Sequence, residues 1–237
     1  MPSKWDRRVN AADWDAVTTE MNNVGGALLP RLITRTECAA VFDLYPDDSL
    51  FRATIDMGSH RYGKGEYRYF NRPYPHPNEE LKQALYPRLL PIARDWWTKL
   101  HREPPWPASL DDWLDMCHRA GQTKPTALLL KYGPGDWNAL HRDLYGDLVF
   151  PLQVVINLHE PGVAHTGGEF LLVEQRPRAQ SRGEVVPLQQ GEAVIFPVHH
   201  RPVEGTRGPY RVTMRHGVSR LRSGERYTLG IIFHDAA

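Results

Sequence analysis

The sequence predicts an α+β fold in which N-terminal helices pack on an antiparallel barrel or jelly roll. Three observations support this prediction. The chain has 237 residues, enough for one domain with a sizeable core. Hydrophobic residues make up 41% of it, an ordinary share for a globular protein. Near residue 125 the pattern changes from helical periodicity to short strands separated by turns.

Residues 1–124 are expected to form mainly helices. A capping box from Thr34 to Glu37 predicts the start of one helix. A longer helix is predicted over residues 78–100, where Pro87 and Pro91 would kink or split it. A further helix is predicted over residues 110–119, after a proline-rich segment.

Residues 51–77, between the first two predicted helices, indicate a strand-loop-strand unit. Basic and aromatic side chains are interleaved in its middle part, and we interpret the unit as a lid over a substrate site. The interleaved residues are Arg61, Tyr62, Lys64, Tyr67, Arg68, Tyr69, Phe70 and Arg72.

Residues 125–237 are expected to form the core. Six segments are short, rich in β-branched, aromatic or aliphatic residues, and bounded by Gly, Pro or polar turns. Such a series is typical of an antiparallel barrel or jelly roll. The predicted strands cover residues 126–132, 150–158, 169–173, 193–196, 210–214 and 227–233.

Composition favours a cytoplasmic protein without a membrane segment. Lys+Arg 29 against Asp+Glu 28 leaves a net charge of +1, so nucleic-acid binding would need a local basic patch. Cys38 and Cys117 are far apart, and we expect no disulfide. No signal-peptide core follows the N-terminus, and no apolar run reaches the length of a membrane span.

The main chemical signal is His141-Arg142-Asp143. Residues i and i+2 of a strand point to the same side, so an imidazole nitrogen and a carboxylate oxygen can meet one cation there. The pair alone is also compatible with a surface loop. His141 to Leu144 also matches the start of a protein-kinase catalytic loop, but Leu148 stands where that motif needs Asn.

The residues around this pair follow an order that resembles the Fe(II)/2-oxoglutarate dioxygenase superfamily. The likeness is to its prolyl-hydroxylase-like and alkylation-repair branches, and to a bacterial group with a long helical N-terminal region. It covers roughly residues 125–235. The matching segments are residues 132–136, His141-Arg142-Asp143, Gly167-Gly168-Glu169-Phe170, His216-Gly217-Val218 and Arg226-Tyr227-Thr228.

This resemblance implies a double-stranded β-helix (jelly-roll) core over residues 125–237, with residues 1–124 as a helical region carrying the lid. It also implies a catalytic centre that binds Fe(II), because two imidazoles and one carboxylate form the facial triad suited to this ion. The open face would take 2-oxoglutarate and O2. The implied metal ligands are His141, Asp143 and His216.

The resemblance further assigns the cosubstrate contacts. Arg226 matches the basic residue that binds the far carboxylate of 2-oxoglutarate, and its planar fork suits a carboxylate. Tyr132 and Thr228 match further contacts, with simple strand packing as the alternative. His199 and His200 are rivals to His216 as the distal ligand, but neither is followed ten residues later by Arg-x-Thr, and simple packing is the alternative for His216. Loop or structural roles are expected for His159, His165 and His234.

The substrate stays open. Oxidative demethylation of DNA or RNA is supported by residues 61–72, whose aromatic groups can stack a flipped base and whose basic groups can hold phosphates. A strand pair with a solvated face is the structural alternative. The predicted substrate contacts are Arg61, Tyr67, Arg68, Tyr69, Arg142 and Tyr145.

Departures from the family patterns keep other functions in view. Alkylation-repair enzymes carry a second Arg six residues after the cosubstrate Arg, where this chain has Ile232. Prolyl-hydroxylase-like members match Gly167-Gly168-Glu169-Phe170 but usually have Lys in place of Arg226. A protein or peptide hydroxylase is therefore one alternative, and a non-catalytic module that senses metal or 2-oxoglutarate is another.

Overall fold

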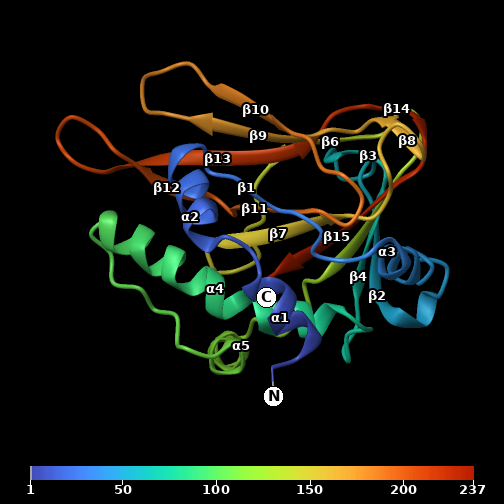
Figure 1. Cartoon of the computed structure of the whole chain (residues 1–237), viewed down its shortest axis with the longest axis horizontal. Coiled ribbons are helices and arrows are strands. Elements are labelled where there is room, and N and C mark those ends of the chain that lie inside the picture. The colour runs from blue at the N-terminus through green and yellow to red at the C-terminus, as the bar shows by residue number, and fades with distance from the viewer. Residues whose placement is uncertain (1) are drawn as a thin grey trace.

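The computed structural model describes residues 2–237 and shows two antiparallel sheets stacked face to face, with helices on one side (Figure 1). The larger sheet lies between the smaller sheet and the helices. This architecture confirms the predicted α+β class with a jelly-roll core.

The larger sheet has seven strands, and both of its edges come from the front half of the chain. Strand β1 pairs with β11 at one edge, while β4 pairs with β5 and carries β2 at the other. The two parts that differ in sequence pattern therefore share one sheet. In order across the sheet, the strands are β1 (Ala27–Leu29), β11 (Ala193–Pro197), β7 (Leu152–Asn157), β15 (Arg226–Ile232), β5 (Leu128–Tyr132), β4 (Glu66–Phe70) and β2 (Phe51–Asp56).

The smaller sheet has six strands and includes several that the sequence pattern missed. All six predicted segments overlap a strand, but β6, β10 and β12 were not among them. β10 and β12 are short and carry charged or polar residues at their starts, and β3 lies within the predicted strand-loop-strand unit. In order, the strands are β10 (Arg182–Val186), β9 (Phe170–Gln175), β13 (Tyr210–Val218), β6 (Trp137–His141) and β3 (Gly63–Lys64), with β12 (His200–Val203) also beside β13. A separate ladder joins β8 (His165–Gly167) and β14 (Leu221–Gly224).

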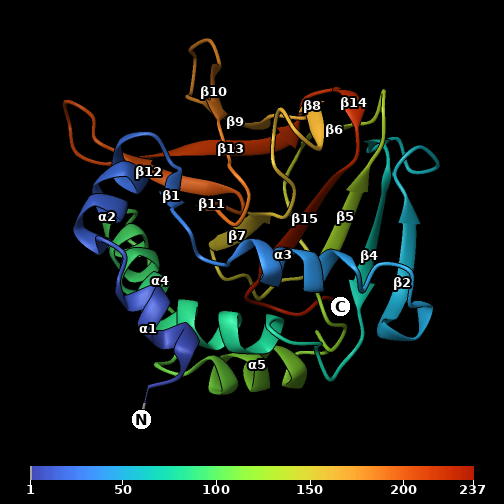
Figure 2. The same ribbon diagram turned by 45° about the vertical axis from the view of Figure 1, so that its right-hand side comes forward.

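Within residues 2–237, five α-helices lie beside the larger sheet, with α4 and α5 beneath it (Figure 2). The predicted capping box is present, since the Thr34 hydroxyl accepts from the Glu37 N–H and the Glu37 carboxylate accepts from the Thr34 N–H at 2.8 Å. No helix within residues 2–237 is long and apolar enough to cross a membrane. The helices are α1 (Lys4–Asn10), α2 (Trp14–Asn23), α3 (Arg35–Phe42), α4 (Asn78–Lys99) and α5 (Leu110–Arg119), with a 3-10 turn η1 (Asp48–Leu50).

Helix α4 passes Pro87 and Pro91 without a break, so the predicted split does not occur. The two prolines are four residues apart and both exposed, so they lie on the solvent side of the helix. Carbonyl groups that lose a backbone donor there can bond to water instead. Buried Leu85, Leu89 and Trp96 hold the opposite face against the core.

A buried arginine fastens the N-terminal helices to the smaller sheet. Arg201 of β12 is fully buried and donates to the carbonyl oxygens of Asn22 at 2.7 Å and Asn23 at 3.1 Å, at the end of α2. It also forms an ion pair with Glu174 of β9, which is 2% exposed. One side chain thus satisfies helix-end carbonyls and a buried carboxylate together.

Candidate metal centre

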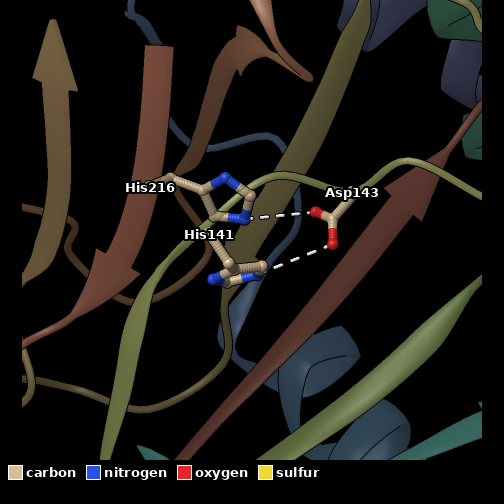
Figure 3. Close-up of side chains that lie close together, drawn as sticks. All are labelled: His141, Asp143 and His216. Atoms are coloured by element: carbon tan, nitrogen blue, oxygen red, sulfur yellow. Dashed lines mark ion pairs between the residues drawn. The ribbon is translucent and has the colours of Figure 1, made fainter. Parts of the chain in front are cut away.

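Strand register brings two distant histidines together. His216 of β13 pairs directly with His141 of β6, and their ring centroids lie 4.1 Å apart. Asp143 follows β6 by two residues and turns its carboxylate toward both rings (Figure 3). Its oxygens lie 3.5 Å from His141 Nε2 and 3.1 Å from His216 Nε2.

The three side chains offer a compact ligand set. One nitrogen or oxygen atom from each lies within 4.8 Å of the others, and within residues 2–237 no other three His, Cys, Asp or Glu side chains come together in this way. Two imidazoles and one carboxylate in this arrangement match the facial triad of Fe(II) oxygenases. The structure therefore brings together the residues that the sequence pattern predicted as metal ligands.

Hydrogen bonding fixes the orientation of the His141 ring. His141 Nδ1 lies 2.7 Å from the carbonyl oxygen of Ala139, which can only accept, so Nδ1 donates to it. Nε2 is then directed at Asp143, as a metal ligand requires. Burial, and then the neighbouring His141, lower the pKa of His216.

Asp143 is held as a carboxylate. Burial alone would raise its pKa, but His216, His141 and the Tyr145 hydroxyl together keep the pKa of Asp143 well below its usual range. Tyr145 donates to Asp143 Oδ1 at 2.9 Å. The hydroxyl groups of Tyr145 and Tyr69 are 3.0 Å apart, so Tyr69 donates to Tyr145 in turn. A chain of two tyrosines therefore links β4 to the carboxylate.

These residues open onto a cavity of about 320 Å³ between the two sheets. The predicted cosubstrate residues line the same cavity, together with polar and apolar groups that the sequence pattern did not single out. Gln153 could have been predicted from the sequence, because it is a polar residue within the apolar strand β7, where it is buried. The additional lining residues include Tyr62, Leu128, Leu130, Asn138, Leu144, Gln153, Val155, Phe170, Val218, Gly230 and Ile232.

Arg226 is a buried cation without a partner among the described residues. It begins β15 opposite Tyr132, is 2% exposed, and its guanidinium carbon lies 5.6 Å from the Tyr132 ring centre. Its Nη1 atom is buried without a hydrogen bond. Burial lowers the pKa of Arg226 to about 10, which still leaves it charged at neutral pH. Such a group on a cavity wall suits a ligand carboxylate.

The other predicted contacts divide into two groups. Thr228 lines the cavity two residues after Arg226, and Tyr67, Arg142 and Tyr145 line it as well. Tyr69 reaches the metal residues only through Tyr145, while Arg61 and Arg68 do not line the cavity. The other histidines of the back half, including His159 and His234, also lie outside the lining.

Arg68 points away from the metal residues. Its guanidinium donates to Asp48 at 2.6 Å and to the Tyr45 carbonyl at 3.0 Å. The hairpin predicted as a lid therefore turns Tyr62 and Tyr67 toward the cavity and this arginine toward its own carboxylates.

A family model described as "Oxygenase, catalysing oxidative methylation of damaged DNA" matches residues 65–236, more than half of the chain. The chain belongs to this oxygenase family. The oxygenase is also 68% identical over 159 residues to the uncharacterised protein Rv2227 of Mycobacterium tuberculosis, covering 67% of this chain and 68% of that protein.

Solved structures share the fold of this oxygenase at low identity. A Pseudomonas putida prolyl-4-hydroxylase matches with a TM-score of 0.54 and 14% identity, covering 92% of this chain and 96% of that one. A Burkholderia pseudomallei oxidoreductase of the 2OG-Fe(II) oxygenase family matches with a TM-score of 0.54 and 17% identity, covering 96% and 95%. The predicted oxygenase class is confirmed by the family match, and these two structures confirm the predicted fold.

Proposed function

We propose that this oxygenase removes methyl groups oxidatively from damaged nucleic acid, with the iron held by His141, Asp143 and His216. The observation that carries the substrate class is the family match, whose description names damaged DNA. The convergence of the three side chains supports the metal site. Likeness to prolyl hydroxylases at 13–14% identity bears on the fold alone.

The donor set fits both cofactors. Bound Fe(II), with 2-oxoglutarate and O2, supplies the oxidising power to hydroxylate a substrate C–H bond, while 2-oxoglutarate leaves as succinate and carbon dioxide. Arg226 would hold the far carboxylate of 2-oxoglutarate, since it is charged, buried and without another partner among residues 2–237. Thr228 and Tyr132, on the same cavity wall, would add hydroxyl contacts.

The protein's own groups hold the geometry of the centre. Tyr145 fixes one carboxylate oxygen of Asp143 by donating to it, and the Ala139 carbonyl fixes the tautomer of His141. Together these contacts direct nitrogen lone pairs and carboxylate charge at one point. The sheets on either side shield that point from bulk water.

The substrate end of the cavity is aromatic. Tyr62 and Tyr67 line it, and Tyr62 is 49% exposed at its mouth, with its ring stacked on His60. Aromatic faces can stack on a base that has left its helix. The stretch 61–72 would thus contact nucleic acid through its tyrosines. Hydroxylation of an N-methyl group gives N–CH2OH, which releases formaldehyde and leaves the bare base.

Turnover of defined substrates tests this function. Purified protein with Fe(II), 2-oxoglutarate and O2 should form succinate and formaldehyde in equal amounts from single-stranded DNA carrying N-methylated bases. The unmethylated strand and the Asp143→Asn variant should form neither, because one lacks the methyl group and the other lacks the carboxylate charge.

Other results would replace the proposal. Succinate formed with proline-containing peptides but not with methylated strands would make the protein a peptide hydroxylase. Binding of 2-oxoglutarate without turnover of any methylated DNA, methylated RNA or peptide would favour a sensing module.

A further inference from the structure

The basic side chains of the lid are largely neutralised by the protein itself. Arg68 pairs with Asp48, Lys64 lies 3.5 Å from Asp136, and Arg72 lies 2.8 Å from the buried Asp235. Of the basic residues in the 61–72 stretch, Arg61 alone lacks a carboxylate within ion-pair distance among the residues described. A strand of phosphates would have to compete with these internal pairs, so the lid is a poor phosphate-binding surface.

A different group of basic residues includes Arg211 and Arg215 on β13, Arg142 just after β6 and Arg102 after α4. Within residues 2–237 none of them forms an ion pair with a carboxylate. Arg102, Arg142 and Arg211 act electrostatically on the stacked rings of His199 and His200, whose centroids are 3.3 Å apart. We call these four arginines the β13 arginine cluster.

Arg142 connects this cluster to the cavity. The pairing of β6 with β13 ends at His141 and His216, so Arg142 and Arg215 both lie next to the end of this ladder. Arg215 faces the outer side of the smaller sheet, because its neighbour His216 faces the cavity. Arg142 lines the cavity and donates to His199 Nε2 at 2.5 Å. Arg211 is exposed four residues before Arg215, on the same face of β13.

The local field at this face is positive. Burial, and then Arg142 and Arg211, lower the pKa of His199 to about 4. Burial, the adjacent His199, Arg211 and the more distant Arg102 lower the pKa of His200 to about 4 as well. No carboxylate is among the causes of these two pKa shifts. Positive groups gathered without compensating negative charge are suited to an anionic partner.

We propose that the β13 arginine cluster holds the backbone phosphates of the nucleic-acid strand whose modified base enters the cavity. This inference rests on the proposed function and names the surface that carries the strand. Arg211 and Arg215 are about 13 Å apart along a strand, long enough for an extended backbone to contact both. Exposed Tyr62 lines the same cavity as Arg142 and offers a stacking surface, so an aromatic and a basic group both border it.

Salt-dependent binding of a labelled strand tests the inference. The full chain would be titrated, anaerobically with Fe(II) and 2-oxoglutarate, against a short fluorescein-labelled single-stranded DNA at several salt concentrations. Arg211→Gln/Arg215→Gln should weaken binding about 25-fold at about 0.1 M salt, because each lost phosphate contact removes roughly 0.7 from the slope of log K against log salt. The slope should therefore fall by about 1.4.

The matched control removes two charges from the lid. Arg61→Gln/Lys64→Gln has the same net charge as the cluster variant and should bind almost as tightly as wild type, with the wild-type slope. Thermal melting of both variants would establish that each is folded.

The possible outcomes separate the two proposals. Suppose that wild type binds and demethylates the strand. If the cluster variant then binds as tightly as wild type, or the lid variant loses as much affinity as the cluster variant, the cluster assignment is wrong and the proposed function stands. If wild type binds neither DNA nor RNA, both proposals fall. Cluster-dependent binding to phosphatidylserine vesicles without strand binding would assign the surface to a membrane and overturn the inference.

Discussion

At the scale of single residues, the proposed metal ligands are positioned by groups that are not themselves ligands. Tyr145 sits beside Asp143 in sequence, which suggested a substrate contact, and the structure adds that its hydroxyl donates to the carboxylate. Tyr69, from a distant strand, supports it. Carboxylate ligands that lose such a donor are free to rotate, so their affinity for metal falls.

Removal of one hydroxyl group tests this chain. Tyr145→Phe should weaken Fe(II) affinity about 10- to 100-fold, because the carboxylate loses its donor. Tyr69→Phe, one step further out, should weaken it less. Anaerobic titration of the metal, followed by the charge-transfer band of the complex with 2-oxoglutarate, measures both. Equal affinity in Tyr145→Phe and wild type would show that the hydroxyl does not position the carboxylate.

At the scale of elements, long-range contacts determine how the helices sit on the sheets. Arg201 joins the end of α2 to β9 and β12 from a fully buried position. Its role could not be read from the sequence, because its partners lie far away along the chain. A local sequence pattern can predict helix periodicity and caps. The contacts of Arg201 with α2 and β9 form only once the strands are paired.

The anchoring arginine makes a measurable contribution to stability. Arg201→Met should lower the free energy of unfolding by about 3 kcal/mol, because it leaves the buried Glu174 without its buried partner. Arg182, an exposed arginine 3.9 Å from the same carboxylate, provides the control. Arg182→Met should cost about 0.5 kcal/mol or less in urea unfolding. Similar losses in both variants would contradict the anchoring role.

Across the whole molecule, the sequence predicted the back half better than the front. His141 and Asp143 could be predicted as a pair because strand alternation is a local property, and Arg226 because its position matches the basic residue of the resembled family. The partners of Lys64 and Arg72 were not found, since Asp136 and Asp235 approach them only through the fold. A basic stretch in the sequence therefore became a largely neutral surface in the structure.

Metal loading should stabilise the entire fold. Fe(II) at about 100 times its dissociation constant should add about 2.7 kcal/mol, and for a chain of this size that is a rise of roughly 5–10 °C in Tm. A chelator should reverse the rise. His216→Ala should show none, whereas His60→Ala, which removes an exposed histidine, should behave as wild type. A full shift in His216→Ala would exclude His216 as a ligand.

The direct pairing of His141 with His216 has a consequence for assembly. The two residues come from distant parts of the chain and meet only when β6 is zipped onto β13. An ion bound by both histidines would link the two strands, because β6 could not separate from β13 without the loss of a ligand. We therefore expect a newly made chain to pair β6 with β13 before it binds iron, and we expect this pairing to open more readily when the ion is removed.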